Sequence, residues 1–429
     1  MGNFTRRQAV TTLGVGVASL AVFGMAGCSG SGGSQVSASA AASDGVDAAS
    51  VKLGLSPYGD ELLAAAAIKR GYFSEVGISF SNGDFGVKTD LIKSVTPLLN
   101  NQIEIGSGYP PAVASQLDNV SGVVGFAYSD VFYGYRILAP EGKFKTVKKE
   151  MAGGASFDDA ITTVMAQLKG QDVILRTGVA PTFYNLLCKQ SGTSMDDWNI
   201  TYLSNDDILR QAESGACDFV SPTGAVEISR LQKESWEPLV DLKEAIEYLP
   251  KDETTALRAT FSGYVTTRDY AEKNWDTILR FTSVMYRIID DMKEDPSGTA
   301  ADFVDYVNDY TGSSLTADEL ADTFDGLYSL QDFDAADAMF NDSSADFNFD
   351  AVMNENLNVL NQEGVLKGTY TADDLSIAKK VYNDLKEYKE KAESLLSKAS
   401  EGDETAEKAQ GYYDIYDYLD AYNIAKGME

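Results

Sequence analysis

Hydrophobic and polar residues along the chain follow two patterns, one typical of short β-strands and the other of helices. Residues 51–55 are apolar at alternate positions and predict a strand, and residues 56–59 supply Ser, Pro and Gly for a turn. Residues 61–69 are rich in Ala and Leu and predict a helix that Gly71 stops. Another strand begins at residues 78–80. Because strands alternate with helices, the pattern predicts an α/β fold with a mainly parallel sheet covered on both faces.

The same order of strand, turn and helix recurs later in the chain. Residues 102–106 predict a strand that leads through Ser107 into a turn and a helix, and residues 216–220 do the same through Ser221, at an offset of 114 positions. The sequence therefore predicts two similar α/β lobes, with the chain crossing between them twice. The boundaries that we expect are 51–135 plus 260–370 for lobe 1, 136–259 for lobe 2, and 371–429 for a C-terminal helical extension.

The N-terminal residues have the features of an export signal. Arg6 and Arg7 are followed by an uncharged stretch that ends in the sequence Met-Ala-Gly before Cys28. We interpret residues 1–28 as a lipoprotein signal peptide of the twin-arginine type, with Cys28 as the lipidated residue. Residues 29–50, rich in Ser, Gly and Ala, are then a flexible tether. The alternative is a retained transmembrane anchor, since about 20 uncharged residues can span a bilayer.

The composition excludes several functions. The 35 Lys and Arg residues stand against 65 Asp and Glu residues, so the formal net charge is −30 and nucleic-acid binding is not expected. The chain contains no histidine, which excludes a Ser-His-Asp or Cys-His catalytic arrangement and a His-containing zinc site. We therefore predict no catalytic residue, no metal site and no cofactor.

Two features leave alternatives open. In an exported protein, Cys188 and Cys217 are either one disulfide or two buried free thiols. The acidic stretch 332–342 has Ala and Met between its carboxylates, so it favours a solvated helical face over a calcium-binding loop.

Several segments resemble a known family. The helix end, Gly, Tyr and Phe of residues 68–73, followed by Gly77 and Ile78, are similar to a signature of solute-binding proteins of ABC importers. Residues 98–106 resemble a second segment of this family, although Asn101 stands where Gly is usual and Glu104 where Asp is usual. Residues 215–218 and 168–173 resemble the corresponding segments of the second lobe. The subgroup is the nitrate, sulfonate, taurine and thiamine-pyrimidine type.

The resemblance covers about residues 51–370 and implies a type II periplasmic-binding fold, no catalysis, and docking to a membrane permease. The family also includes pyrimidine synthases that consume their own histidine, and a chain without histidine does not perform that reaction.

Ligands of α/β sheets bind at the carboxyl ends of the strands, and two facing lobes place these ends around one cleft that closes like a hinge. The candidate ligand-binding residues follow the matched strands or lie at a crossing: Tyr58, Phe85, Ser107, Tyr109, Tyr128, Arg176, Thr177, Asn205, Ser221 and Thr223.

Arg176 is the strongest of these candidates, because its guanidinium can clamp a carboxylate, sulfonate or phosphate. Its alternative role is an ordinary salt bridge. The alternative for Ser107, Asn205 and Ser221 is helix N-capping. The tyrosines favour a planar or aromatic ligand, whereas Arg176 favours an organic anion.

We therefore expect a monomeric, exported, lipid-anchored protein that delivers a small molecule to an ABC permease. A sensory or interaction lipoprotein with the same fold, and an exported hydrolase, are the alternatives. Residues 371–429 carry helical Lys and Glu spacing and several tyrosines, which fits either a helical hairpin packed on lobe 1 or a docking surface for a partner.

Overall fold

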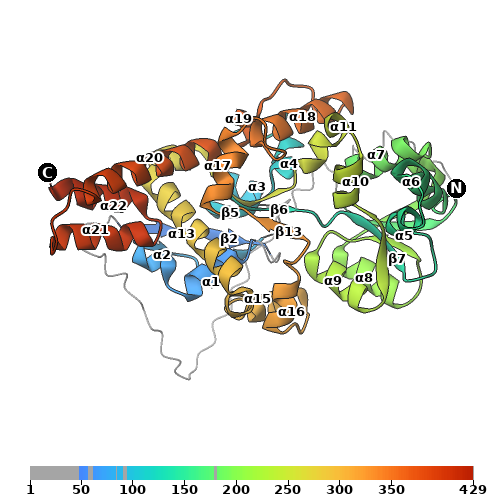
Figure 1. Cartoon of the computed structure of the whole chain (residues 1–429), viewed down its shortest axis with the longest axis horizontal. Helices are drawn as coiled ribbons and strands as arrows, with labels where there is room; N and C mark the ends of the chain where they lie inside the picture. Colours follow the sequence, from blue (N-terminus) through green and yellow to red (C-terminus); the bar gives the residue numbers. More distant parts are fainter. Residues whose placement is uncertain (1–47, 57–60, 84, 90–93, 178–180, 429) are drawn as a thin grey trace, which may run out of the picture. The chain divides into compact units, whose positions relative to one another are not determined.

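Two β-sheets carry the fold, and the chain passes from one to the other and back (Figure 1). The computed structural model describes residues 48–56, 61–83, 85–89, 94–177 and 181–428, all within a unit that extends from Ala40 to Glu429. The predicted signal peptide 1–28 with Cys28, most of the tether 29–50, and Tyr58 lie outside the described residues.

The first sheet has six strands in the order β13-β6-β12-β5-β2-β4. Its strands β2, β4 and β5 are parallel to one another, whereas β12, β6 and β13 are antiparallel to their neighbours. The prediction of a mainly parallel sheet is therefore wrong for half of this sheet, because β6 takes the chain out of the lobe and β12 brings it back. Their bounds are β2 (Leu53–Leu55), β4 (Val87–Lys88), β5 (Ile105–Gly108), β6 (Val123–Phe132), β12 (Phe261–Thr267) and β13 (Tyr328–Leu330).

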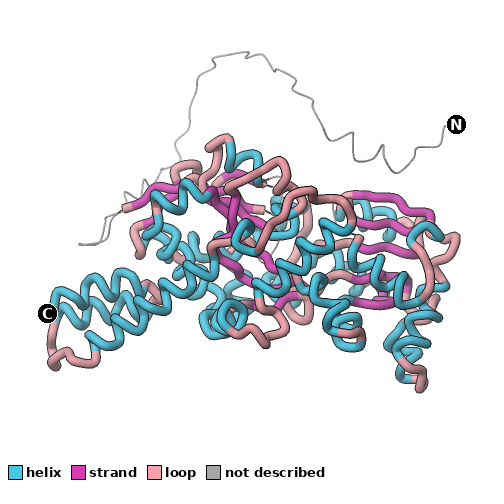
Figure 2. The backbone as a smooth tube through the Cα atoms, turned by 90° about the horizontal axis from the view of Figure 1, so that it is seen from above, coloured by secondary structure: helices cyan, strands magenta, loops and turns pink. Residues whose placement is uncertain are grey.

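The second sheet has five strands in the order β11-β7-β10-β8-β9, with β10, β8 and β9 parallel. Figure 2 shows these strands side by side with helices around them. Their bounds are β7 (Arg136–Pro140), β8 (Asp172–Arg176), β9 (Asn199–Leu203), β10 (Phe219–Ser221) and β11 (Trp236–Asp241). A further pair, β1 (Ala49–Val51) and β3 (Ile78–Phe80), forms a separate two-stranded parallel sheet.

Alternating residues of the second sheet belong to two different hydrophobic cores. Val173 and Phe219 pack in one core, and Ile174 and Val220 in the other, as expected for a sheet that is covered on both faces. Cys188 belongs to the first core and Cys217 to the second, so the sheet separates them. Both are buried free thiols, which decides against the disulfide.

Helices cover these sheets, and the helix predicted over residues 61–69 forms over Leu63–Lys69. The predicted helix before Gly71 ends at Lys69, and Gly71 has a φ of 81°, a conformation that favours glycine and stops the helix. The helices of the first passage through lobe 1 are α1 (Leu63–Lys69), α2 (Tyr72–Glu75), α3 (Val95–Leu99) and α4 (Pro110–Ala114).

The helices after the first crossing and after the return differ in length. The segment between β7 and β12 carries α5 (Val147–Ala152), α6 (Phe157–Ala166), α7 (Thr182–Ser191), α8 (Asn205–Glu213), α9 (Ala225–Lys233), α10 (Leu242–Tyr248), α11 (Lys251–Thr254), and the short 3₁₀ segments η2 (Met195–Asp197) and η3 (Thr255–Arg258). The later segment carries α12 (Arg268–Lys273), α13 (Trp275–Glu294), α14 (Pro296–Ala300), α15 (Val304–Thr311), α16 (Ala317–Asp322), α17 (Phe333–Asn341), α18 (Phe349–Gln362) and α19 (Ala372–Leu375). No helix of the described residues has the length and hydropathy required to cross a membrane.

Three C-terminal helices follow, of which the first and the last pack against α13, the longest helix of lobe 1, and the middle one packs on the other two. They are α20 (Ala378–Leu396), α21 (Glu404–Asp414) and α22 (Tyr418–Ala425), followed by the short segment η4 (Lys426–Met428). Tyr418 and Leu419 belong to the same hydrophobic core as the first sheet. The indole N–H of Trp275 donates to the Asp384 carboxylate at 2.9 Å. The C-terminal segment is therefore an integral layer of the lobe 1 core.

A buried ion pair fixes α22 on α13. The Nε and Nη2 atoms of Arg280 donate to the two carboxylate oxygens of Asp420 at 2.7 and 2.9 Å, and the two side chains are only 6% and 3% exposed. Burial and the neighbouring Asp420 charge raise the pKa of Asp417 well above its usual range. Burial therefore favours the protonated form of Asp417 beside the Arg280–Asp420 pair.

We expect Asp420→Asn to lower the free energy of unfolding by about 3 kcal/mol or more, because it leaves a buried guanidinium without its countercharge. The matched control is Glu387→Gln, which removes one partner of the exposed pair with Lys391 on α20 and should cost less than about 1 kcal/mol. Urea unfolding of the three proteins checks this. Equal losses in the two variants would contradict the assigned role of the buried pair.

Candidate functional site

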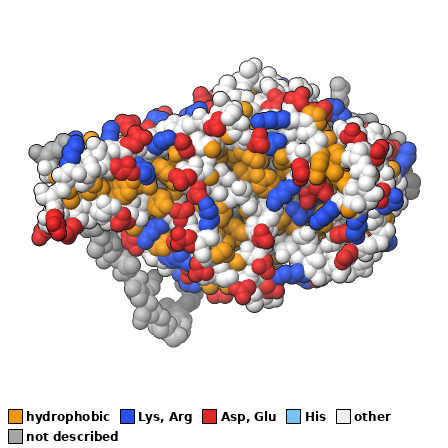
Figure 3. Space-filling view, viewed as in Figure 1, with side chains coloured by type: hydrophobic (Ala, Val, Ile, Leu, Met, Phe, Trp, Pro, Cys, Tyr) orange, Lys and Arg blue, Asp and Glu red, His pale blue; other side chains and the backbone are white. Residues whose placement is uncertain are grey.

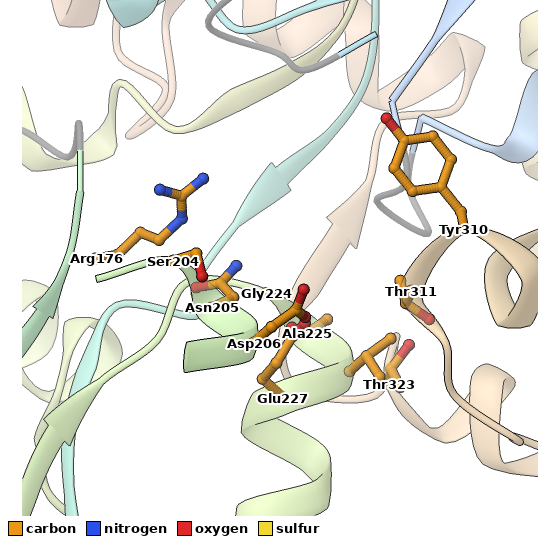
Figure 4. A pocket seen from close by; sticks show the side chains of 11 residues that line it. Arg176, Ser204, Asn205, Asp206, Gly224, Ala225, Glu227, Tyr310, Thr311 and Thr323 are labelled. Carbon is orange, nitrogen blue, oxygen red and sulfur yellow. The ribbon is translucent and has the colours of Figure 1, made fainter. Parts of the chain in front are cut away.

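A cavity of about 140 Å³ lies at the carboxyl ends of strands β8 and β9. Lobe 2 supplies one wall and the helices α15 and α16 of lobe 1 the other, as Figure 4 shows. This is the position that the strand-end rule predicts for a ligand. The lining residues are Arg176, Ser204, Asn205, Asp206, Gly224, Ala225, Val226, Glu227, Tyr310, Thr311 and Thr323.

A second cavity of about 300 Å³ adjoins the first and continues it outward along α9. Asp206, Val226, Glu227 and Thr311 line both cavities. The rim of the second cavity holds Lys233 of α9 and Glu319 of α16, whose charged atoms lie 3.4 Å apart. Together the two spaces reach the size range of small-molecule sites.

Arg176 is the last residue of β8 and extends from the strand end beside the cavity (Figure 4). Its Nη1 donates to the carbonyl oxygen of Thr177 at 2.7 Å, which fixes the direction of the side chain. Its Nε is buried and has no hydrogen-bond partner among the described residues. Because a buried donor without a partner is costly, this atom is suited to an acceptor group of a ligand.

Asn205 holds two strand ends of the cavity together. It is the first residue of α8, and its Oδ1 accepts a hydrogen bond of 3.1 Å from the backbone N–H of Thr223, which follows β10. The side chain is 8% exposed and lines the cavity. The helix cap is the neighbouring Ser204, whose hydroxyl accepts from Asp207 N–H, so the capping alternative for Asn205 is wrong.

Glu227 is the most unusual group of the site. It lies in the first turn of α9, is 7% exposed, and lines both cavities. Burial raises the pKa of Glu227 to about 7, while a hydrogen bond from its own backbone N–H opposes the shift. Among its charged neighbours, Asp206 raises this pKa, and Arg176 and Arg230 lower it. The group is therefore poised to change protonation state near neutral pH.

The wall from lobe 1 is uncharged and is held firmly. The hydroxyl of Tyr310 donates to the carbonyl oxygen of Thr89, just after β4, at 2.7 Å. The hydroxyl of Thr323 donates to the Leu320 carbonyl oxygen at 2.7 Å. Next to the cavity, the buried residues Ala225 and Ile228 of α9 pack with lobe 1 residues in a small hydrophobic cluster. Apolar contact between the lobes thus accompanies the polar cavity.

Two predicted serines tie strands together instead of lining the cavity. The Oγ of Ser107 accepts from the backbone N–H of Ser56 at 3.0 Å, and the Oγ of Ser221 donates to the carbonyl oxygen of Arg136 at 2.5 Å. Both are fully buried. The N-caps of the helices that follow them are Tyr109 and Gly224, so neither serine is a cap. The alignment of the two lobes correctly identified Ser107 and Ser221 as equivalent residues, but in both lobes the serine hydrogen-bonds to the backbone of a neighbouring segment and does not line the cavity.

The remaining predicted residues lie in three surroundings. The hydroxyl oxygens of Tyr109 and Tyr135 form a hydrogen bond of 3.0 Å beside the first crossing, and burial raises the pKa of both. Tyr128 is 4% exposed and stacks on Phe349 at 5.1 Å in the lobe 1 core, and Phe85 packs on Tyr306 at 5.3 Å. Thr177 is exposed next to Arg176, and Thr223 contacts the site through Asn205.

The structure therefore brings Arg176 and Asn205 into the cavity lining, with Thr177 and Thr223 adjacent. The predicted tyrosine-lined cleft is not found in the described residues, because Tyr109 and Tyr128 are packed elsewhere. The sequence analysis missed Glu227, Tyr310, Thr311 and Thr323. One signal was present: at the offset of 114, Glu227 aligns with Val113, so an acid stands where the other lobe has a buried apolar residue.

The arrangement presents groups that can bind a ligand. Within the described part of the chain, no three acidic or Cys side chains come together in a way that could hold a metal ion. The cavity offers a cationic fork, an amide, hydroxyl groups and a titratable carboxyl. These are groups that orient a small polar ligand.

No protein-family model matches the chain, and no curated protein matches its sequence. Several solved structures are similar to the chain. The chain is similar to the periplasmic aliphatic sulphonate binding protein from Escherichia coli, with 18% identity and a TM-score of 0.52 over 76% of this chain and 91% of that one. It is similar to the alkanesulfonate-binding protein from Xanthomonas axonopodis pv. citri bound to MOPS, with 15% identity and a TM-score of 0.51 over 77% of this chain and 99% of that one.

A third similar structure is a sulfonate-binding protein of an ABC transporter from Methylobacillus flagellatus, with 13% identity and a TM-score of 0.52 over 80% of this chain and 96% of that one. At these identities the similarity establishes the fold. The chain has the two-lobed fold of periplasmic binding proteins, and the fold class expected from the sequence is confirmed.

The raised pKa of Glu227 predicts a pH-dependent stability. The pKa of this carboxyl is about 4.5 in the unfolded chain and about 7 in the folded protein. Below pH 4.5 the carboxyl is protonated in both the folded and the unfolded state, and its contribution to the free energy of unfolding is fully present. That contribution is lost as the pH rises through about 7. Glu227→Gln should therefore be more stable than the wild type at pH 8 by about 3 kcal/mol, a difference that disappears toward pH 4.5.

Urea unfolding between pH 4.5 and 8 checks this difference. The burial-raised pKa of Glu244, also about 7, acts equally in both proteins and cancels. The control is Glu234→Gln at the exposed C-cap of the same helix, which should follow the wild type at every pH. Parallel profiles of wild type and Glu227→Gln would contradict the burial of a neutral carboxyl.

Proposed function

We propose that the protein is an exported, lipid-anchored solute-binding protein that captures a small molecule between its two lobes and delivers it to an ABC permease. The observation that carries this proposal is the cavity at the strand ends between the lobes, where Arg176, Asn205 and Glu227 present polar groups to an enclosed space. Two of the solved proteins with this fold are named as sulfonate-binding proteins, and the name of one of them includes an ABC transporter. Binding without reaction fits a cavity that contains no nucleophile activated by a histidine.

Membrane attachment needs the lipid, because the protein surface itself does not favour it. Acidic side chains are spread over the face shown in Figure 3, with Lys and Arg interspersed, and the net charge is −30. Such a surface is repelled by anionic headgroups. The N-terminal Arg6-Arg7 pair and Cys28 supply the export route and the anchor in this proposal.

Residues 44–429 should bind a small polar molecule in a thermal-shift panel of sulfonates, nitrate, carboxylates, amino acids, pyrimidines, thiamine precursors and flavins. A ligand at 100 times its Kd stabilises the folded protein by about 2.7 kcal/mol, a shift of several degrees in Tm. Arg176→Ala should weaken a ligand with an anionic group by about tenfold or more. The control is Arg210→Ala, whose side chain on α8 pairs with Asp207 and does not line the cavity.

A panel without any shift, in a protein that melts cooperatively, would count against the solute-binding function and in favour of an interaction lipoprotein. A ligand that binds Arg176→Ala and Arg210→Ala equally well would show that the site lies elsewhere.

The lipid anchor is tested with the full chain in a bacterial host. Cys28→Ser should move the protein from the membrane fraction to a soluble fraction, because the lipid is attached through this thiol. Cys188→Ser, at a buried thiol inside lobe 2, should leave the protein in the membrane fraction. Membrane retention of Cys28→Ser would instead identify residues 8–27 as a transmembrane anchor.

A further inference from the structure

The N-terminus of α9 opens on the cavity and lacks a cap from its N-cap residue. The N-cap is Gly224, which has no side chain to accept a hydrogen bond from the first turn. Unpaired N–H groups and the helix dipole make such an end attractive for a negative group. In a solute-binding protein, this would be a natural position for the anionic group of a ligand.

The negative group at this end belongs to the chain itself. A Cβ added to Gly224 would lie 1.8 Å from Oε2 of Glu227 and 2.8 Å from Nδ2 of Asn205. The Glu227 carboxyl therefore folds back over the Gly224 backbone, where only glycine leaves room for it. It also accepts a hydrogen bond from its own N–H. A ligand anion at the same helix end would be placed against this carboxyl.

The two most buried ionisable groups of the cavity lining lack a close ion-pair partner among the described residues. Arg176 and Glu227 both line the cavity, and the Arg176 charge lowers the pKa of Glu227, but neither side chain forms a salt bridge with a described residue. Asp206 adds a second carboxylate to the lining. A buried carboxylate is costly unless it is paired, and a ligand with a positive group would provide the pairing.

We propose that the ligand is a small zwitterion, whose protonated amine pairs with the Glu227 carboxylate while Arg176 binds its anionic group. This inference rests on the solute-binding function proposed above and names the class of its ligand. It separates this site from one built for simple sulfonates or carboxylates, because the helix end that would hold such an anion is filled by Glu227. The Tyr310, Thr311 and Thr323 wall bears no charge and closes the cavity from lobe 1.

Matched pairs of compounds that differ only in the amine provide the test. The probes are 3-aminopropanoate against propanoate, 2-aminoethanesulfonate against ethanesulfonate, and 4-aminobutanoate against butanoate, titrated into residues 44–429 at pH 8 by calorimetry. In at least one pair the amine-bearing member should bind the wild type at least tenfold more tightly than its partner. Glu227→Gln should reduce that preference at least tenfold, whereas Glu234→Gln, on the same helix but outside both cavities, should preserve it.

The outcomes separate this inference from the function on which it rests. If a compound without an amine binds the wild type as tightly as its amine partner, the zwitterion inference is overturned and the solute-binding function stands. If no member of any pair binds, while another class in the wider panel does, the inference is again overturned and the function stands. Arg176→Gln provides a second variant should Glu227→Gln fail to fold, and it should weaken the amine-bearing ligand at least tenfold.

Discussion

The antiparallel pairing of β6 with β12 is the interaction on which the two-lobed arrangement depends. β6 is buried along its whole length, and β12 pairs with it from Phe261 to Thr267. The end of β6 continues into lobe 2, and β12 begins where the chain returns, with Phe132 N–H donating to the Thr260 carbonyl oxygen at 2.9 Å. Both crossings therefore leave lobe 1 side by side.

The site reflects a compromise between stability and binding. Glu227 is held in a buried position that raises its pKa, and the Nε of Arg176 is buried without a hydrogen-bond partner among the described residues. Each of these features costs folding free energy. Groups that lack partners in the folded protein are those that gain most when a ligand arrives.

The C-terminal helices add buried contacts to lobe 1. The helix α13 contacts the first sheet on one side and α20 and α22 on the other, so its apolar and charged faces are both covered. From the sequence, the C-terminal tyrosines fitted either a packing role or a docking role. In the structure, Tyr418 packs in the main core and Tyr412 in a smaller one.

The order of strands and helices could be predicted because it depends on local patterns. Residues 51–80 alternate between apolar strands and an Ala-rich helix, and Gly71 stops that helix through its own backbone freedom. The antiparallel half of the first sheet could not be predicted in this way, because the direction of β6 and β12 follows from the path of the chain between lobes. At the site, Arg176 and Asn205 could be predicted as candidates from the sequence, because both stand directly after predicted strands.

By itself, the sequence determined the α/β class, the two matched lobes and two of the residues that line the cavity, since these depend on periodicity and on position along a strand. The tertiary structure alone decided which of the candidates face the cavity. Ser107 and Ser221 have the same local surroundings in sequence as a ligand contact, but buried neighbours occupy their hydroxyls. Glu227 has the local sequence of an ordinary acid in a first helical turn, and only the packing of lobe 1 against α9 encloses it. Burial is a property of the assembled fold, and it is burial that turns this carboxyl into a titratable group at the centre of the site.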